Sequence, residues 1–340
     1  MEGNAQNEIR IGKADRSMNF GIIGYGYAGQ QHAAALASIE GVALCAIADV
    51  DERKRARASA QTYGDYRVLL ENPSIDAVSI CLPHHLHEEV ALAALSAGKH
   101  ILIEKPLALT VAAGGALCNL AKTTNRILMV EMTHRFLLPL LQAKRRIANG
   151  DIGEIVAVDE LLVEDVGVFG SLPRWMLDRD QSGGGVGLTS GIHLLDHISW
   201  ISQQRLTLRS ASFSYGQRLG NVEDTAAFAL KTDQGVPVHV LLCWRRQGTG
   251  LDGRLTIVGT GGTLKVWPWG WIHVQSETDV DKKSFFPEPS TIAERALIGI
   301  KGAVQEFLDA IRQDRPPDPS PEESLISQAI IEEAYRNWGE

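Results

Sequence analysis

The sequence predicts an α/β protein with two domains: an N-terminal doubly wound parallel sheet and a C-terminal α/β domain built on a large open, mostly antiparallel sheet. Three observations support this fold class. The chain has 340 residues, enough for two domains with cores of their own. In its first part, short apolar runs alternate with helical stretches. In its second part, strand-like segments follow one another with turn residues between them, as in antiparallel hairpins.

The N-terminal domain is expected over residues 18–138, after a polar segment, residues 1–17, that we expect to be a flexible tail. Its expected strands are Phe20–Ile23, Ala43–Ala48, Ala77–Leu82, His100–Ile103 and Ile127–Val130. Its expected helices are Ala28–Ile39, Asp51–Thr62, His87–Ala97 and Val111–Lys122. Because strands that alternate with helices form parallel βαβ units, helices should cover both faces of this sheet.

The C-terminal domain is expected over residues 139–340. Helices are expected at Leu141–Asn149, Leu188–Ser202, Ala293–Arg312 and Pro321–Tyr335, and a glycine-rich loop at Ser182–Gly187. The expected strands are Glu154–Val166, Thr207–Tyr215, Thr225–Lys231, Val236–Trp244, Arg254–Gly259, Thr263–Trp267 and Ile272–Gln275. A sheet of this kind has helices on one face and leaves a broad face to be covered, which predicts self-association through it.

The composition argues against several classes of function. The net charge is −8, and no basic stripe is present to bind phosphate backbones, so no nucleic-acid partner is expected. No apolar run approaches the roughly 18–20 residues of a membrane span, and no membrane partner is expected. Four widely separated cysteines indicate neither a disulfide framework nor a metal cage, which favours the reducing cytoplasm.

A glycine-rich turn follows the first expected strand and opens the first expected helix. It reads Gly24-Tyr25-Gly26-Tyr27-Ala28-Gly29, a complete G-x-G-x-x-G. Gly24 permits the tight turn, Gly26 lets the backbone approach a pyrophosphate, and Gly29 allows close packing of helix on strand. The N-terminus of the helix, at Tyr27 and Ala28, offers N–H groups and a partial positive charge to the phosphates. The turn therefore predicts a Rossmann dinucleotide-binding domain.

Asp49 stands at the end of the second expected strand, 49 − 29 = 20 residues after the last glycine of the turn. At this spacing an acid accepts hydrogen bonds from the ribose hydroxyls of the adenosine. A carboxylate there would repel a 2′-phosphate, which favours NAD over NADP as the cofactor. Arg53 leaves NADP open, because a nearby arginine can accommodate that phosphate.

The stretch Ala94–Ala108, which contains Ile103-Glu104-Lys105-Pro106, closely resembles the signature of the glucose–fructose oxidoreductase/inositol dehydrogenase (Gfo/Idh/MocA) family. Other matching motifs are Pro83-His84-His85-Leu86-His87, His134-Arg135-Phe136, Gly183-Gly184-Gly185, Gly191-Ile192-His193-Leu194-Leu195-Asp196 and Glu223-Asp224-Thr225-Ala226. The resemblance runs from about Met18 to the end of the chain. It implies an active site between a Rossmann domain and a C-terminal α/β domain, and a homodimer or homotetramer.

The resemblance implies that Lys105 and His193 are the catalytic residues. Hydride transfer from an alcohol leaves a proton on oxygen, which a protein group must take. Lys105 would stabilise the developing alkoxide, and His193 would act as general base or acid. On spacing alone, Lys105 would be a surface lysine paired with Glu104, and only the motif favours the catalytic role. The alternative for His193 is a core histidine. Thr189 stands where many family members have an aspartate, so we expect His193 to keep a lower pKa than it would beside an acid.

Other residues complete the predicted site. Leu82, Pro83, His84 and His87 are expected beside the nicotinamide ribose, and Glu104 at the nicotinamide or against Lys105. The substrate is expected to meet His134, Arg135, Trp175 and Thr189 as well as Lys105 and His193. An ion pair would explain Arg135 equally well, and core packing Trp175. No metal is expected, because His193, Asp196 and His197 are too few ligands. The pair Glu164-Asp165 gives a weaker hypothesis, a partner for an amino group of the substrate.

The predicted function is that of an NAD-dependent dehydrogenase or ketoreductase. Its substrate class is a sugar, amino sugar, sugar nucleotide or cyclitol with a secondary alcohol or ketone carbon. Two alternatives stay open: an enzyme that retains its NAD, as in sugar–sugar oxidoreduction or redox-assisted glycoside cleavage, and a non-catalytic NAD-sensing regulator. The presence of both Lys105 and His193 argues against the regulator, which needs no proton relay.

Overall fold

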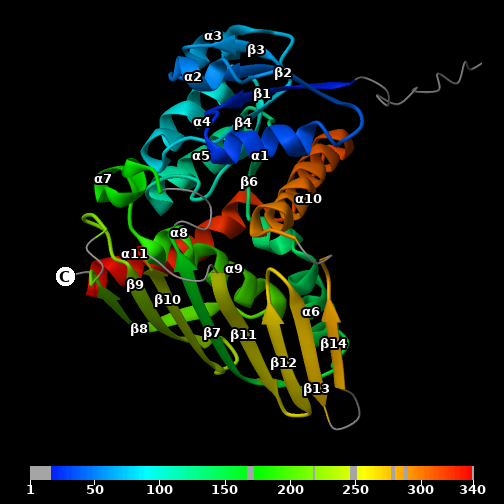
Figure 1. The fold of residues 1–340 in the computed structure, drawn as a ribbon, viewed down its shortest axis with the longest axis vertical. Coiled ribbons are helices and arrows are strands. Elements are labelled where there is room, and N and C mark those ends of the chain that lie inside the picture. Colours follow the sequence, from blue (N-terminus) through cyan, green and yellow to red (C-terminus); the bar gives the residue numbers. More distant parts are fainter. Residues whose placement is uncertain are drawn as a thin grey trace, which may run out of the picture.

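The computed structural model describes residues 17–166, 172–216, 219–245, 251–276, 280–286 and 290–338, so the predicted tail falls outside it except for Ser17. The described chain forms two sheets, one above the other in Figure 1, with helices between and around them. This arrangement confirms the predicted α/β class: a parallel sheet first, then a mostly antiparallel one. No helix in the described ranges is long and apolar enough to cross a membrane.

The first sheet is a six-stranded parallel sheet in the order β3-β2-β1-β4-β5-β6. Its strands are β1 (Met18–Ile23), β2 (Val42–Ala48), β3 (Gln61–Tyr63), β4 (Ala77–Ile80), β5 (His100–Ile103) and β6 (Leu128–Val130). This order is that of the Rossmann fold, in which ligands bind at the carboxyl ends of the strands where the strand order reverses, here between β1 and β4.

The helices of the first domain are α1 (Tyr27–Leu36), α2 (Glu52–Arg55), α3 (Tyr66–Glu71), α4 (His87–Ser96) and α5 (Val111–Thr123). The predicted helix Asp51–Thr62 is wrong. α2 buries none of its residues, so no packing against the core stabilises further turns after Arg55. Gln61–Tyr63 instead pairs with β2 as the edge strand β3. Short 3₁₀ turns follow β4 at His84–Leu86 and β6 at Thr133–Phe136.

The second sheet has eight strands in the order β14-β13-β12-β11-β7-β10-β9-β8. They are β7 (Ile155–Asp165), β8 (Leu206–Ser214), β9 (Thr225–Thr232), β10 (Pro237–Arg245), β11 (Leu251–Gly259), β12 (Gly262–Trp267), β13 (Trp271–Ser276) and β14 (Val280–Ser284). β7 and β10 pair in parallel, and the other neighbours pair antiparallel. β14 was not predicted, because its Val280–Ser284 sequence is mostly polar and exposed, as an edge strand allows.

Helices gather on one face of the second sheet, as predicted (Figure 1). They are α6 (Leu138–Ala148), α7 (Arg179–Ser182), α8 (Val186–Thr189), α9 (Gly191–Ser202) and α11 (Pro321–Trp338). The single helix predicted at Leu188–Ser202 is instead divided into α8 and α9 at Ser190. That break places Ser190 and its neighbours near the other domain.

Helix α10 (Ile292–Gln313) returns from the second domain to the first, where it lies beside α1 (Figure 1). Phe307 of α10 meets Phe20 of β1 edge-on, with ring centroids 5.9 Å apart. The last part of the chain therefore contributes to the core of the Rossmann domain, and the two domains are joined by packing as well as by the chain between them.

Candidate active site

The glycine turn between β1 and α1 has the shape that a bound pyrophosphate needs. A Cβ on Gly24 would lie 2.2 Å from the carbonyl oxygen of Cys81, and one on Gly29 would lie 2.0 Å from that of Gly24. Gly24 also has φ of 92°, which favours glycine. At Gly26, by contrast, a Cβ would meet no atom within 4 Å, so the loop faces open space. α1 starts there with no side-chain cap and no acid in its first turn, which leaves the positive end of its dipole uncompensated.

Asp49 is held in place at the end of β2. Its Oδ2 accepts the Tyr25 N–H at 2.7 Å, its Oδ1 accepts the Asp51 N–H at 2.8 Å, and the residue is 8% exposed. Lys54, which the sequence analysis did not name, places its Nζ 3.4 Å from Oδ2. Arg53 instead pairs with Asp51, with both of its guanidinium contacts at 3.1 Å. The cation on the Asp49 carboxylate is therefore Lys54 and not Arg53.

His87 fastens the turn after β4 to the loop after β5. Its Nε2 lies 2.9 Å from the carbonyl oxygen of Leu82, and its Nδ1 lies 2.7 Å from that of Pro106. The residue is 0% exposed. We therefore assign His87 to holding these two loops, including Pro83, in position rather than to a direct contact with a cofactor.

His84 joins the same turn to the glycine-rich loop of the second domain. Its Nδ1 donates to the carbonyl oxygen of Ser182 at 2.7 Å, and its ring meets that of Trp175 edge-on, with centroids 4.7 Å apart. Burial lowers the pKa of His84 well below its ordinary value, and the positive charges of His87 and Lys105 add to this. Trp175 thus lies on the His84 side of the site, where the nicotinamide is expected.

Lys105 follows β5 and reaches across to the second domain. Its Nζ donates to the carbonyl oxygen of Thr189, at the end of α8, at 2.5 Å. Burial lowers the pKa of Lys105 below 10.5, although the negative charges of Glu104 and Glu164 oppose that shift. The interpretation of Lys105 as a surface lysine does not fit this position, because the side chain is half-buried and spans the two domains.

His193 lies in the first turn of α9 at the end of a stack of histidines. Its ring stacks on that of His134 with centroids 4.4 Å apart, and His134 Nδ1 lies 3.1 Å from His197 Nδ1. Behind them, His197 Nε2 lies 2.9 Å from both carboxylate oxygens of Glu160. Burial lowers the pKa of His193 well below 6.5. The Lys105 charge and the repulsion between His193 and His134 when both are protonated act in the same direction, and burial lowers the pKa of His134 as well. His193 is therefore a neutral imidazole at pH 7, able to accept a proton.

Two polar atoms beside Lys105 are buried and have no hydrogen-bond partner among the described residues. They are Thr189 Oγ1 and His193 Nδ1. Buried polar groups are nearly always paired, so each such atom calls for an explanation. Together with the Lys105 ammonium, they are hydrogen-bonding groups that a polyhydroxylated ligand could satisfy.

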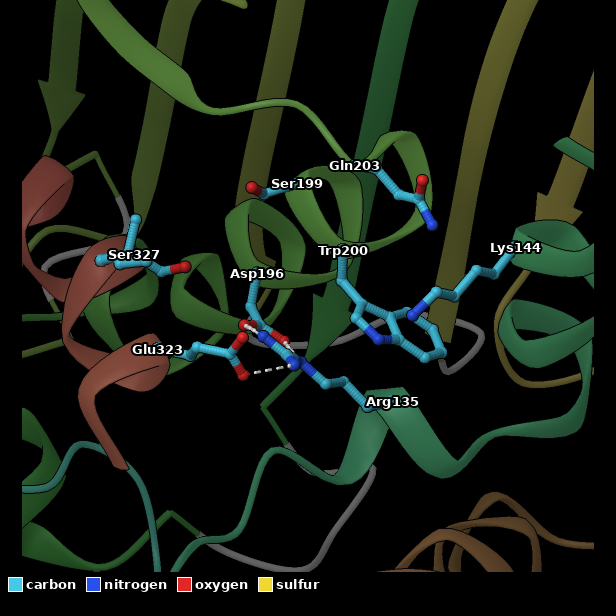
Figure 2. Close-up of a pocket in the computed structure, with 9 residues that line it drawn as sticks. Arg135, Lys144, Asp196, Ser199, Trp200, Gln203, Glu323 and Ser327 are labelled. Atoms are coloured by element: carbon cyan, nitrogen blue, oxygen red, sulfur yellow. Dashed lines mark hydrogen bonds and ion pairs between the residues drawn. The ribbon is translucent and has the colours of Figure 1, made fainter. Parts of the chain in front are cut away.

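Arg135 is part of an ion-pair cluster. It donates to both carboxylate oxygens of Asp196 at 2.8 and 2.7 Å, and to Glu323 at 3.1 Å. Figure 2 shows this cluster beside Lys144 and Trp200 in a pocket of about 230 Å³ that neither Lys105 nor His193 lines. The ion-pair interpretation of Arg135 fits this geometry, and we do not retain Arg135 as a substrate residue. Both carboxylate oxygens of Asp196 accept from Arg135, and the His197 ring contacts Glu160.

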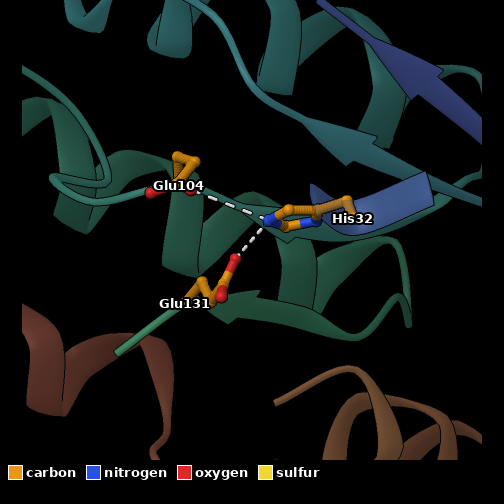
Figure 3. Close-up of side chains that lie close together, drawn as sticks. All are labelled: His32, Glu104 and Glu131. Carbon is orange, nitrogen blue, oxygen red and sulfur yellow. Dashed lines mark ion pairs between the residues drawn. The ribbon is translucent and has the colours of Figure 1, made fainter. Parts of the chain in front are cut away.

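A second buried cluster lies behind Glu104. Figure 3 shows the ring of His32, on α1, with one ring nitrogen directed at the carboxylates of both Glu104 and Glu131. His32 Nε2 is in direct contact with Glu131 and 3.6 Å from Glu104 Oε1, while its Nδ1 is 2.5 Å from Ser79 Oγ. One histidine and two carboxylates can ligate a cation, but the contact between the His32 and Glu131 side chains leaves no space for an ion between them. The cluster fixes Glu104 beside Lys105.

Glu223 shapes the glycine-rich loop, a role that the sequence analysis missed. Its carboxylate accepts the N–H groups of Gly185 and Gly187, both at 2.9 Å, and the Tyr335 hydroxyl at 2.6 Å. A Cβ on Gly185 would lie 1.9 Å from the Glu223 carbonyl oxygen, so this position requires glycine. These hydrogen bonds of Glu223 hold the glycine-rich loop that leads into α8 and α9.

Both domains match known protein families. Residues 18–132 match the family model described as "Oxidoreductase family, NAD-binding Rossmann fold", and residues 140–265 match the "GFO/IDH/MocA C-terminal domain". Inositol 2-dehydrogenase 2 of Saccharopolyspora erythraea is 30% identical over 261 residues, which is 74% of each chain. D-glucoside 3-dehydrogenase of Escherichia coli is 32% identical over 189 residues, which is 53% of this chain and 52% of that protein.

Solved structures share the arrangement of both domains. An oxidoreductase domain protein from Kribbella flavida superposes with a TM-score of 0.84 at 25% identity, over 95% of this chain and 97% of that one. A levoglucosan dehydrogenase in complex with NADH and levoglucosan has a TM-score of 0.79 at 23% identity, over 94% of this chain and 97% of that one. At this identity, the second likeness concerns the fold alone.

Proposed function

Because the chain belongs to the GFO/IDH/MocA family of NAD-binding oxidoreductases, we propose that it is an NAD-dependent dehydrogenase or ketoreductase of a sugar, amino sugar, sugar nucleotide or cyclitol. One observation carries the proposal. Lys105 of the first domain donates a hydrogen bond to the backbone of Thr189 in the second domain, four residues before His193. Thr189 and His193 each have a buried side-chain atom without a hydrogen-bond partner among the described residues, which a substrate could satisfy. The names of relatives, which include an inositol, a glucoside and a levoglucosan dehydrogenase, support the substrate class.

The residues present fit a dinucleotide. Gly24, Gly26 and Gly29 would hold its pyrophosphate at the start of α1, and Asp49 its adenosine ribose. When bound, NAD would supply the acceptor for the hydride of the alcohol carbon. The Asp49 carboxylate favours NAD over NADP, and the positive charge of Lys54 beside it weakens the repulsion of a 2′-phosphate.

The chain's own residues handle the proton. In oxidation, neutral His193 takes the proton of the substrate hydroxyl, while the Lys105 ammonium hydrogen-bonds the same oxygen and stabilises its developing negative charge. In reduction, His193 returns the proton to that oxygen. The Thr189 carbonyl holds the Lys105 side chain in position, and the charge of Glu104, which pairs with His32, favours the ammonium form of Lys105.

The proposal is tested with purified protein mixed separately with NAD and NADP and a panel of sugars, amino sugars and cyclitols. We expect substrate-dependent NADH formation, lost in Lys105→Ala and in His193→Ala while both variants still bind NAD. Tight NAD binding without net NADH would favour the alternative of an enzyme that retains its cofactor. Failure of the folded protein to bind either dinucleotide would refute the proposal.

The helix-free face of the eight-stranded sheet also supports a proposal about assembly. Leu241 of β10 is 43% exposed there, near the centre of a sheet that has helices on its other side. We propose that a second copy of the chain covers this face in a homodimer or homotetramer. A cytoplasmic setting is proposed from the four cysteines, all of them free thiols.

A further inference from the structure

Strand β7 carries two acids on the face that the helices cover. Val158, Glu160 and Leu162 are buried along this strand, and side chains alternate between its faces, so Glu164 lies on the same face as Glu160. Asp165 lies on the other face, paired in the ladder with Arg245. The acidic pair in the sequence is therefore divided between the two faces, and Glu164 alone faces the helices.

The two inward acids have different surroundings. Glu160 is 3% exposed, and both of its oxygens contact His197. Glu164 is half-buried, and one oxygen, Oε2, accepts the Ser190 hydroxyl at 2.5 Å and the Trp244 Nε1–H at 3.0 Å. No described residue bonds its Oε1. A carboxylate has about four acceptor sites, so Oε1 of Glu164 can still accept hydrogen bonds.

The position of Glu164 ties it to the proposed active site. Ser190, which holds it, is the break between α8 and α9, next to the Thr189 carbonyl that accepts the Lys105 ammonium and three residues before His193. Burial raises the pKa of the Glu164 carboxyl, and the Lys105 charge acts in the opposite direction, so the two groups are close enough to interact. The site thus has a carboxylate although residue 189 is a neutral threonine.

We propose that Glu164 is a substrate-binding residue whose Oε1 accepts a hydrogen bond from the hydroxyl adjacent to the reacting carbon. The substrate class is then a vicinal diol, with one oxygen on Lys105 and His193 and the neighbouring hydroxyl on Glu164. A hydroxyl suits this place better than an ammonium group, because the Lys105 charge already acts on the carboxylate and would repel a second positive charge there. This inference rests on the proposed dehydrogenase function.

The first test compares Glu164→Gln with the wild type on a diol that the wild type oxidises. Glutamine keeps an oxygen acceptor for Ser190 and Trp244, so the fold should be retained, as thermal unfolding will report. We expect kcat/KM to fall by about 10- to 100-fold, the range for loss of a hydrogen bond to a charged group, with NAD affinity unchanged. Asp165→Asn is the matched control, because it removes the neighbouring acid on the opposite face, and its kcat/KM should stay at the wild-type value.

The second test uses an analogue of the same substrate that lacks the adjacent hydroxyl. Wild type should prefer the diol to the deoxy analogue, and Glu164→Gln should lose most of that preference, because the variant has an amide donor where the charged Oε1 acceptor of the adjacent hydroxyl was. The double variant Glu164→Gln with Thr189→Asp should recover part of it, since residue 189 adjoins Ser190. A preference for the diol as strong in Glu164→Gln as in wild type overturns the inference.

The two proposals fail in distinguishable ways. If wild type forms no NADH with any compound of the panel, the dehydrogenase proposal fails first. Glu164 is then judged by calorimetric binding of myo-inositol to the NAD-loaded protein, where weaker binding by Glu164→Gln than by Asp165→Asn supports its role. Equal binding by the two variants counts against it.

Discussion

Burial governs the two nitrogen groups that we propose to carry the chemistry. Burial lowers the pKa of both Lys105 and His193. Nearby acids oppose the shift at Lys105, whereas the Lys105 charge adds to the shift at His193. For His193 the result is a neutral ring that can take a proton, with the stacked His134 favouring that state further. For Lys105 the result is an ammonium group that loses its proton at a lower pH than a lysine in water.

These shifts predict the pH dependence of alcohol oxidation. The reaction needs His193 neutral and Lys105 charged, so kcat/KM falls when His193 gains a proton on the acid side and when Lys105 loses one on the alkaline side. The acid limb should therefore lie well below pH 6.5 and the alkaline limb below pH 10.5. Initial rates of NADH formation across this range measure both limbs, and an acid limb at or above pH 6.5 would contradict the assignment of His193.

At the residue scale, the sequence could predict groups that sit in local motifs. Lys105 and His193 stand in short runs that identify them without the fold. Glu164 stands in no such motif, and the sequence offered it only together with Asp165, as a partner for an amino group. Its contact with Ser190, which is 26 residues away along the chain, could not be predicted in this way. The sequence does predict which face of the strand Glu164 occupies. Glu160 and Glu164 are four residues apart on an expected strand, so both acids lie on the same face.

Among the secondary-structure elements, the predictions succeeded where an apolar run or a full amphipathic helix was present. β1, β4 and β5 are buried from solvent over most of their length, and their sequences are correspondingly apolar. β3 and α2 were mistaken for one helix because neither buries a continuous face. The break between α8 and α9 is set by tertiary contacts of Ser190 and Thr189, which no local pattern reports.

The turn between β1 and α1 allows a prediction about cofactor binding. In Gly29→Ala the new methyl group would lie 2.0 Å from the Gly24 carbonyl oxygen, so the turn must shift and NAD affinity should fall sharply. Gly115→Ala is the control, because a Cβ at this position of α5 meets no atom within 4 Å. That variant should bind NAD normally and gain about 0.5–1 kcal/mol in its free energy of unfolding. Isothermal calorimetry and urea unfolding measure the two effects, and equal NAD affinity in both variants would contradict this account of the turn.

The whole molecule is two sheets held together by α10 and by side chains that cross between the domains. Lys105 and His84 both bond to backbone carbonyls of the second domain, at Thr189 and Ser182. The sequence predicted the two domains from the change in pattern near residue 138. It did not predict that α10 would return to the first domain, because an amphipathic pattern does not say which surface a helix covers.

Assembly through the exposed sheet face gives a prediction at this scale. Leu241→Lys places a charge at the centre of that face and should shift the protein toward monomer in sedimentation velocity. Val68→Lys is the matched control, since Val68 is an exposed apolar residue on α3, outside the sheet, and is 48% exposed against 43% for Leu241. A wild-type protein that sediments as a monomer at every concentration, or a Leu241→Lys variant that assembles like wild type, would rule this interface out.

The central claim is that hydride passes between an alcohol carbon of the substrate and NAD. The most direct measurement mixes the protein and NAD with polyols deuterated at carbon and determines the mass of the nicotinamide cofactor afterwards. The account predicts deuterium in the NADH that wild type forms, and none with Lys105→Ala. A cofactor that stays unlabelled with every polyol, although the folded protein binds NAD, would contradict it.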